Sequence, residues 1–109
     1  MLDQKTCVPC QGGIPPLTKE EAEKFLGEIP NWRLVDDATK LVRGFDFPNF
    51  MDSLEFATKI SHLAEEEGHH PDICFGWGYC NVSVYTHKIG GLHENDFILA
   101  AKIGQLYQS

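Results

Sequence analysis

Two adjacent histidines, His69 and His70, are the residues of this chain best suited to move a proton. Three glutamates, residues 65–67, precede them at the expected end of a helix, and Pro71 follows. Negative charge at a helix C-terminus is unfavourable by about 0.3–1 kcal/mol per charge. The same surroundings favour a protonated imidazolium, which suits a proton donor. A solvated acidic helix end that histidines merely follow is an equally good interpretation of this stretch alone.

The other histidines and one aspartate have simpler interpretations. His87 is a third candidate, because it is expected on the polar face of the last strand, before a glycine-rich turn. His62, within a long helical stretch, and His93, at the expected cap of the last helix, are interpreted as structural. Asp96, in the first turn of that helix, is most simply a favourable partner of the helix dipole.

Metal binding explains these residues less well than acid–base chemistry. Cys7 and Cys10 are spaced as zinc ligands, but no second CxxC or HxxxH motif completes a set of four. His69, His87 and a carboxylate would imitate a two-histidine, one-carboxylate iron site, yet the sequence offers no ligand pair at helical spacing. We therefore expect no metal.

Composition excludes several classes of function. The chain has 109 residues, with 16 acidic and 9 basic side chains and a formal net charge of −7. This charge argues against binding to nucleic acid, which needs a basic surface, and against an anionic membrane surface. The sequence has no apolar stretch of about 20 residues and no signal-peptide core. We expect a cytoplasmic protein with free thiols.

The order of periodic segments predicts an α+β fold. Residues 1–16 are expected to form an extended N-terminal arm on the surface, and residues 17–109 a single domain. Thr18 and Glu21 form a capping box that begins the first helix. The predicted helices are 19–28, 49–67 and 93–107, and the predicted strands are 32–35, 40–47, 73–77 and 79–87. We expect a four-stranded antiparallel sheet with three helices packed on one face.

The spacing of the candidate residues resembles the signature of the pterin-4a-carbinolamine dehydratases. It runs from a glutamate through a His-His-Pro triplet and a tryptophan to a histidine and an aspartate: Glu65, His69, His70, Pro71, Trp77, His87 and Asp96. The resemblance extends over about residues 17–107. The arm lies outside the signature, so the resemblance assigns Cys7 and Cys10 no role.

The resemblance implies dehydration of 4a-hydroxytetrahydropterin to quinonoid dihydropterin and water, the activity of the hydro-lyase 4a-hydroxytetrahydrobiopterin dehydratase. It implies that His69, His70 and His87 line the pterin pocket. We expect His69 and His87 to transfer protons and His70 to hold or deprotonate the ring. Glu65 would orient or charge a histidine, with Asp96 nearby, and Trp77 would pack at the pocket wall rather than react. The residues expected to bind or orient the substrate are Glu65, Pro71, Trp77 and Asp96.

The same resemblance sets expectations for partners. No metal or organic cofactor is implied, because the pterin is itself the substrate. Recycling of tetrahydrobiopterin links the family to aromatic amino acid hydroxylases, and a homodimer or homotetramer is expected. Animal members also serve a homeodomain transcription activator, a role that nothing in this sequence supports. The alternative is a non-catalytic pterin-binding or regulatory partner, although such a protein would not need an acid and a base together.

Overall fold

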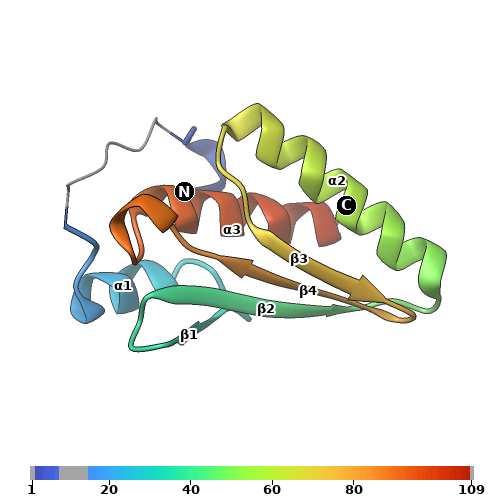
Figure 1. Cartoon of the computed structure of the whole chain (residues 1–109), viewed down its shortest axis with the longest axis horizontal. Helices are drawn as coiled ribbons and strands as arrows, with labels where there is room; N and C mark the ends of the chain where they lie inside the picture. The colour runs from blue at the N-terminus through green and yellow to red at the C-terminus, as the bar shows by residue number, and fades with distance from the viewer. Residues whose placement is uncertain (1, 8–14, 109) are drawn as a thin grey trace.

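The chain folds into one antiparallel sheet with helices on one side (Figure 1). The structure is a computed structural model and describes residues 2–7 and 15–108. In chain order the elements are η1 (Leu2–Gln4), α1 (Lys19–Leu26), β1 (Arg33–Val35), β2 (Lys40–Asp46), α2 (Phe50–Glu67), β3 (Asp72–Gly76), β4 (Tyr79–Val84), η2 (His87–Ile89) and α3 (Glu94–Gln108). The predicted α+β class is confirmed, and the helices and strands agree with the predicted ones apart from their ends.

The sheet has the strand order β1-β2-β4-β3, and every neighbouring pair is antiparallel. α2 and α3 pack on one face, while α1 packs against α3 and β1. On β4 the side chains of Cys80, Val82 and Val84 point into the core, whereas Tyr79 and Asn81 are exposed. This is the predicted alternation of a sheet with one buried face.

The end of α2 directs the chain toward the candidate site. Gly68 adopts φ 65°, a left-handed conformation, and its amide donates to Ala64 O. The amide of His69 also donates to Ala64 O, at 3.2 Å. Glycine enters this conformation without the steric penalty of a Cβ. The predicted C-cap is therefore confirmed, and it places His69 and His70 in the turn between α2 and β3.

Residues 2–7 differ from the predicted extended surface arm. Leu2 begins the 3₁₀ turn η1. Leu2 and Cys7 are buried, with only 3% and 9% of their surface exposed. η1 packs against α3, and Lys5 Nζ lies 2.6 Å from Glu94 Oε2 in the first turn of that helix. Burial of the apolar side chains of Leu2 and Cys7 against α3 accounts for the difference. Cys10 lies outside the described residues.

β4 ends earlier than predicted, so His87 does not lie on a strand. The last residue pair between β2 and β4 is Leu41 with Val84. Beyond it, Thr86 pairs with Gly91 in an isolated bridge, with Thr86 N donating to Gly91 O at 2.9 Å. The residues between them form the turn η2, which begins at His87. The chain therefore leaves the sheet before His87 and folds back through η2.

Gly91 packs closely against Pro16, which leaves no room for a side chain at position 91. A Cβ on Gly91 would lie 2.6 Å from Pro16 Cβ, whereas a Cβ on Gly27 would meet only Lys24 O, at 3.4 Å. We expect Gly91→Ala to lower the free energy of unfolding by about 1–3 kcal/mol. Gly27→Ala, at φ −61°, should change it by less than about 0.5 kcal/mol or raise it. Urea unfolding measures both, and equal effects would contradict close packing of Gly91 against Pro16.

Candidate active site

Three histidines from two distant segments line one cleft. His69 and His70 follow α2, and His87 begins η2 after β4. Together with Gly68 and the residues 85, 86 and 88 they line a cleft of about 370 Å³. The hairpin of β3 and β4 explains the convergence, because Asp72 pairs with Ser83 and so the segments before β3 and after β4 lie side by side. The three residues predicted to share a pocket are therefore brought together.

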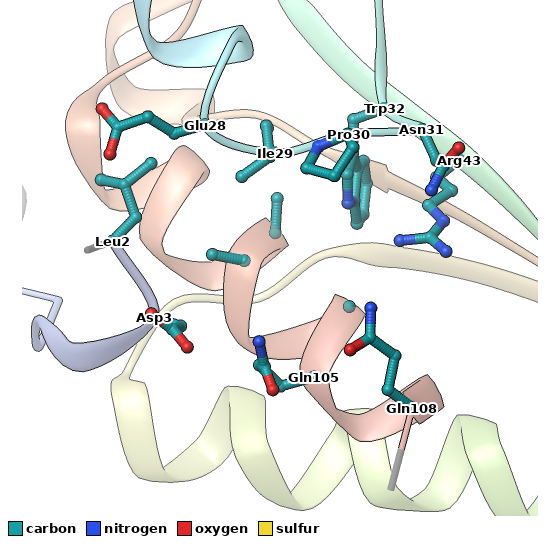
Figure 2. Close-up of a pocket in the computed structure, with 13 residues that line it drawn as sticks. Leu2, Asp3, Glu28, Ile29, Pro30, Asn31, Trp32, Arg43, Gln105 and Gln108 are labelled. Atoms are coloured by element: carbon teal, nitrogen blue, oxygen red, sulfur yellow. The ribbon is translucent and has the colours of Figure 1, made fainter.

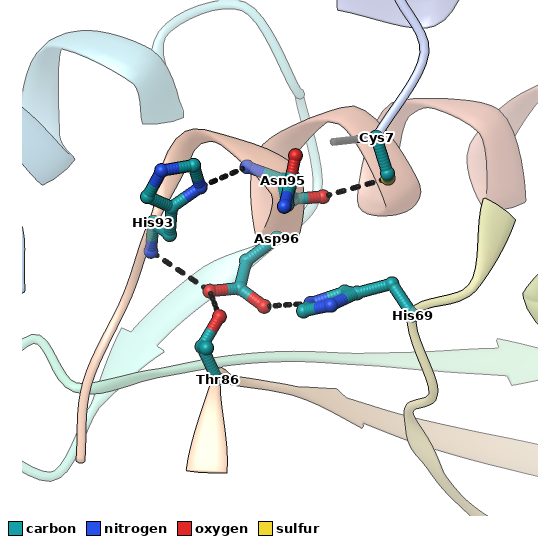
Figure 3. A network of polar contacts seen from close by, with 6 residues as sticks. All are labelled: Cys7, His69, Thr86, His93, Asn95 and Asp96. Atoms are coloured by element: carbon teal, nitrogen blue, oxygen red, sulfur yellow. Dashed lines mark hydrogen bonds and ion pairs between the residues drawn. The ribbon is translucent and has the colours of Figure 1, made fainter. Parts of the chain in front are cut away.

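A buried carboxylate holds this end of the molecule together. Asp96 has no exposed surface. Its Oδ1 lies 2.5 Å from His69 Nε2, and its Oδ2 accepts hydrogen bonds from Thr86 Oγ1 at 2.7 Å and His93 N at 2.9 Å (Figure 3). We call Asp96 and these three partners the Asp96 cluster. The cluster joins the turn after α2, the segment after β4 and the start of α3.

The Asp96 contact fixes how His69 can act. A carboxylate only accepts hydrogen bonds, so Nε2 of His69 is the donor. In the neutral ring the free lone pair is then on Nδ1. The side chain of His69 is 11% exposed, so it meets the cleft with a small part of its surface. Any proton that His69 takes up from a ligand would go to Nδ1, and Asp96 would stabilise the resulting positive charge.

His93 caps α3, as predicted from the sequence. Its ring Nδ1 accepts a hydrogen bond from Asn95 N at 3.1 Å, while the carboxylate of Asp96 accepts from its backbone N–H. This is the reciprocal arrangement of a capping box, with an imidazole nitrogen in place of a hydroxyl. Asp96 also lies in the first turn of α3, where its charge favours the helix dipole. The sequence indicated only this second effect.

His70 is paired with Glu65 at the rim of the cleft. His70 Nε2 lies 2.5 Å from Glu65 Oε2, and the two side chains are 62% and 77% exposed. Exposed pairs of this kind contribute at most about 1 kcal/mol to stability. The contact therefore matters for the direction of the His70 ring more than for the fold. Pro71 follows His70 directly and leads into β3, but it does not line the cleft.

His87 also lines the cleft, against an aromatic ring. The ring centroids of His87 and Tyr85 are 4.1 Å apart. Lys40 Nζ lies 4.8 Å from the centroid of the Tyr85 ring. Tyr85 was not predicted as a site residue, although it precedes His87 by two positions, the spacing at which strand residues share a face. The structure adds Tyr85 to the cleft as the side chain that supports the His87 ring.

Trp77 does not lie at the cleft of its own chain. It is in the turn between β3 and β4 and is 71% exposed. β3 starts two residues after His70 and leads away from the cleft, so its five residues separate Trp77 from the cleft by about 17 Å. The prediction that Trp77 packs at the pocket wall is therefore wrong within one chain. Spacing along the sequence did not reveal at which end of the hairpin the tryptophan lies.

Glu67 belongs to a second cluster rather than to the histidines. Its Oε1 accepts from Cys7 N at 2.9 Å, and its Oε2 accepts from Lys102 Nζ at 2.8 Å. We call these three residues the Glu67 cluster. Burial alone would raise the pKa of Glu67, but the hydrogen bonds from Cys7 and Lys102 outweigh it and the pKa is lowered. The acidic end of α2 is thus satisfied by α3 and the N-terminal arm.

Cys7 connects the two clusters. Its thiol donates to Asn95 O at 3.6 Å, next to Asp96 in the chain (Figure 3). Burial, together with the nearby Glu67, raises the pKa of the Cys7 thiol to about 12. The thiol therefore stays protonated and acts as a structural donor. Sequence reasoning missed this role, because the cysteine and its partners are far apart in the chain.

The described residues contain neither a metal-binding group nor a membrane span. Within residues 2–7 and 15–108, no three or more His, Cys, Asp or Glu side chains lie close enough to one another to bind the same metal ion. None of the helices in that same part of the chain has the length and apolar character needed to cross a membrane. The predicted absence of a cofactor stays a prediction.

The Glu67 cluster should stabilise the fold at neutral pH. Because the pKa of Glu67 is lowered on folding, its stabilisation is present above the ordinary value of 4.5 and is lost as the pH falls through the lower folded value. We expect Glu67→Gln to lower the free energy of unfolding by about 1–3 kcal/mol at pH 7. The difference from the unaltered chain should shrink as the pH falls below 4.5.

Glu66→Gln is the matched control, because Glu66 is the exposed neighbour. It should change the free energy of unfolding by less than about 0.5 kcal/mol. Urea unfolding between pH 3 and 8 measures all three proteins. A Glu67→Gln effect that equals the Glu66→Gln effect, or that does not change with pH, would contradict the cluster.

One protein family matches most of the chain. The family model described as pterin 4 alpha carbinolamine dehydratase matches residues 15–106. A Methylococcus capsulatus protein named as a candidate pterin-4-alpha-carbinolamine dehydratase is 65% identical over 105 residues, which is 96% of this chain and 92% of the relative. A similarly named protein of Cupriavidus pinatubonensis is 56% identical over 105 residues, 96% of this chain and 90% of that protein.

Two solved structures are similar in fold. One is a transcriptional coactivator/pterin dehydratase from Brucella melitensis, with a TM-score of 0.79 and 27% identity, covering 84% of this chain and 98% of that one. The other is a pterin dehydratase-like protein described as a RuBisCO assembly factor in the alpha-carboxysome. Its TM-score is 0.62 at 28% identity, with 72% of this chain and 92% of that chain covered.

Proposed function

The chain belongs to the pterin 4 alpha carbinolamine dehydratase family, and from this premise we propose that it dehydrates 4a-hydroxytetrahydropterin by histidine acid–base catalysis. The observation that carries the proposal is the convergence of His69, His70 and His87 on one cleft. The buried Asp96 holds one of the three rings in a single orientation. A cleft with several such rings is suited to giving and taking protons.

The reaction needs one proton donor and one proton acceptor. The bond between carbon 4a and the hydroxyl oxygen breaks, and the oxygen takes a proton and leaves as water. The adjacent ring nitrogen loses its proton, and its electron pair forms the new double bond to carbon 4a. Atoms and electrons balance without an oxidant or a metal. Each proton transfer assisted by a positioned side chain typically contributes about 10²- to 10⁴-fold in rate.

We assign the two proton transfers to His69 and His87, which both line the cleft. His69 would act through Nδ1, because its Nε2 is bound to Asp96. His87 is exposed and lies against Tyr85, so a ligand can reach its ring. His70 would hold or deprotonate the pterin ring, with Glu65 setting its direction. The orientation in which the substrate binds decides which of His69 and His87 donates the proton to the leaving hydroxyl group.

Membership of the family also suggests a metabolic role, a location and an oligomeric state for the protein. We propose that the product returns to the tetrahydrobiopterin pool used by aromatic amino acid hydroxylases, which would be the source of the 4a-hydroxylated substrate. We also propose that the protein acts in the cytoplasm as a homodimer or homotetramer. These statements are supported by membership of the family.

A second candidate is a pterin-binding or regulatory protein without catalysis. It is favoured by one observation, the similarity of the fold to a pterin dehydratase-like protein described as a RuBisCO assembly factor. The three histidines of the cleft weigh against it, because a binding protein has no use for a separate acid and base. A rate measurement on the 4a-hydroxylated substrate separates the two candidates.

Stopped-flow absorbance of 4a-hydroxytetrahydropterin decay tests the proposal. The unaltered chain should accelerate the decay well beyond buffer, and His69→Ala and His87→Ala should each lose about 10²-fold or more of that acceleration. His62→Ala is the control, because His62 is exposed on α2 and does not line the cleft. It should keep full activity.

Two results would reject dehydration by these histidines. If the unaltered chain does no better than buffer but still binds a pterin analogue, the non-catalytic candidate is correct. If both cleft variants keep the activity of His62→Ala, the reaction does not depend on His69 and His87.

A further inference from the structure

A second cavity, of about 240 Å³, lies away from the histidine cleft (Figure 2). It is lined by η1, the loop between α1 and β1, the middle of β2 and the second half of α3. It shares no lining residue with the cleft. The proposed dehydration does not use it, so its side chains need an explanation of their own.

Arg43 enters this cavity from the buried face of the sheet. It lies on β2 between Leu41 and Phe45, which are 0% and 2% exposed and point toward the helices. Side chains two positions apart on a strand share a face, so Arg43 also points toward α3. Figure 2 shows the guanidinium at one end of the cavity. A cation on the core face of a strand is unusual unless it is paired.

Arg43 has no acidic partner among the described residues. The contacts of its guanidinium there are with aromatic rings, at 4.3 Å from the Phe45 centroid and 5.6 Å from the Tyr107 centroid. Burial lowers the pKa of Arg43, because the protein removes part of the water around its charge. Arg43 lines the cavity, and among the described side chains no buried nitrogen or oxygen lacks a partner, so its guanidinium is not fully enclosed by protein.

A glycine lets the guanidinium of Arg43 lie close to α3. Gly104 lies inside α3, where glycine is less favourable than alanine by about 0.5–1 kcal/mol. A Cβ at this position would lie 3.3 Å from Arg43 Nη1. The absence of a side chain therefore lets Nη1 approach α3 without a tight contact. The fork of the guanidinium has the geometry to bind a carboxylate through two parallel hydrogen bonds.

The rest of the lining indicates which anion fits. The indole of Trp32, 5% exposed, forms an apolar wall, and the amides of Asn31 and Gln108 add polar groups. Asp3 and Glu28 line the opposite end, as Figure 2 shows, and their charges disfavour a dianion such as phosphate. We propose that this cavity binds a small organic monocarboxylate, with its carboxylate on Arg43 and its apolar part against Trp32.

Fluorescence of Trp32 tests the proposal in the full chain. The chain has two tryptophans, so Trp77→Phe leaves Trp32 as the single reporter. Acetate, propionate and butyrate are titrated at constant ionic strength with chloride as the balancing anion, and phosphate is the comparison. We expect a saturable change with each carboxylate, and at least tenfold weaker binding of phosphate. Arg43→Met in the same background should weaken carboxylate binding at least tenfold.

Position 104 provides a matched pair of variants. Gly104→Asp places a carboxylate within reach of Arg43, so it should raise the melting temperature and abolish the response to carboxylates. Gly104→Ala restores a better helix residue without a charge, so it should keep a saturable response. The pair keeps the test valid if Arg43→Met fails to fold.

Three results would overturn the proposal. One is the absence of a saturable response to any carboxylate. Another is an equal response in Arg43→Met or Gly104→Asp, which would mark adventitious binding elsewhere. The third is phosphate binding as tight as that of the carboxylates, which would reject the class of ligand. None of these readouts depends on dehydratase activity, so this proposal and the proposed function can fail separately.

Discussion

The arrangement of the cleft depends on one buried carboxylate. Asp96 is fully removed from solvent, and a charge in that position is tolerated only when hydrogen bonds replace its water. Its partners come from three parts of the chain: His69 after α2, Thr86 after β4 and the backbone of His93 before α3. Satisfying Asp96 therefore fixes where these segments meet. The same contacts orient one catalytic candidate and hold Thr86, the neighbour of His87, at the cleft.

The Glu67 cluster explains why an acidic helix end is tolerated beside the site. Of the three glutamates that end α2, Glu65 pairs with His70, whereas Glu67 binds Lys102 and the backbone of Cys7. The first contact acts on the cleft and the second on the fold. Glu67 thus ties the end of α2 to α3 close to the point where the Asp96 cluster does so. The N-terminal arm joins this contact through Cys7, which also reaches Asn95.

Sequence patterns predicted the parts of this structure that local rules control. Alternation on β4, the capping box of α1 and the glycine after α2 depend on neighbouring residues, and all three are present. The shared cleft of the three histidines was implied by a resemblance to a family, and the β3–β4 hairpin explains it. The contact of Cys7 with Glu67, 60 residues away, has no local signature. Two predictions were wrong for a similar reason: the position of Trp77 at the pocket wall and the extension of β4 to His87. Both depend on where the strands end, which is set by partners distant in sequence.

A double-mutant cycle on His69 and Asp96 tests most directly whether Asp96 serves catalysis by holding His69. The value of kcat is measured for His69→Ala, Asp96→Asn and the double variant, each checked for folding by circular dichroism. We predict that Asp96→Asn lowers kcat in the unaltered chain but has little further effect once His69 is alanine. If the two losses multiply in the double variant, Asp96 acts independently of His69, and the cleft does not depend on this contact for catalysis.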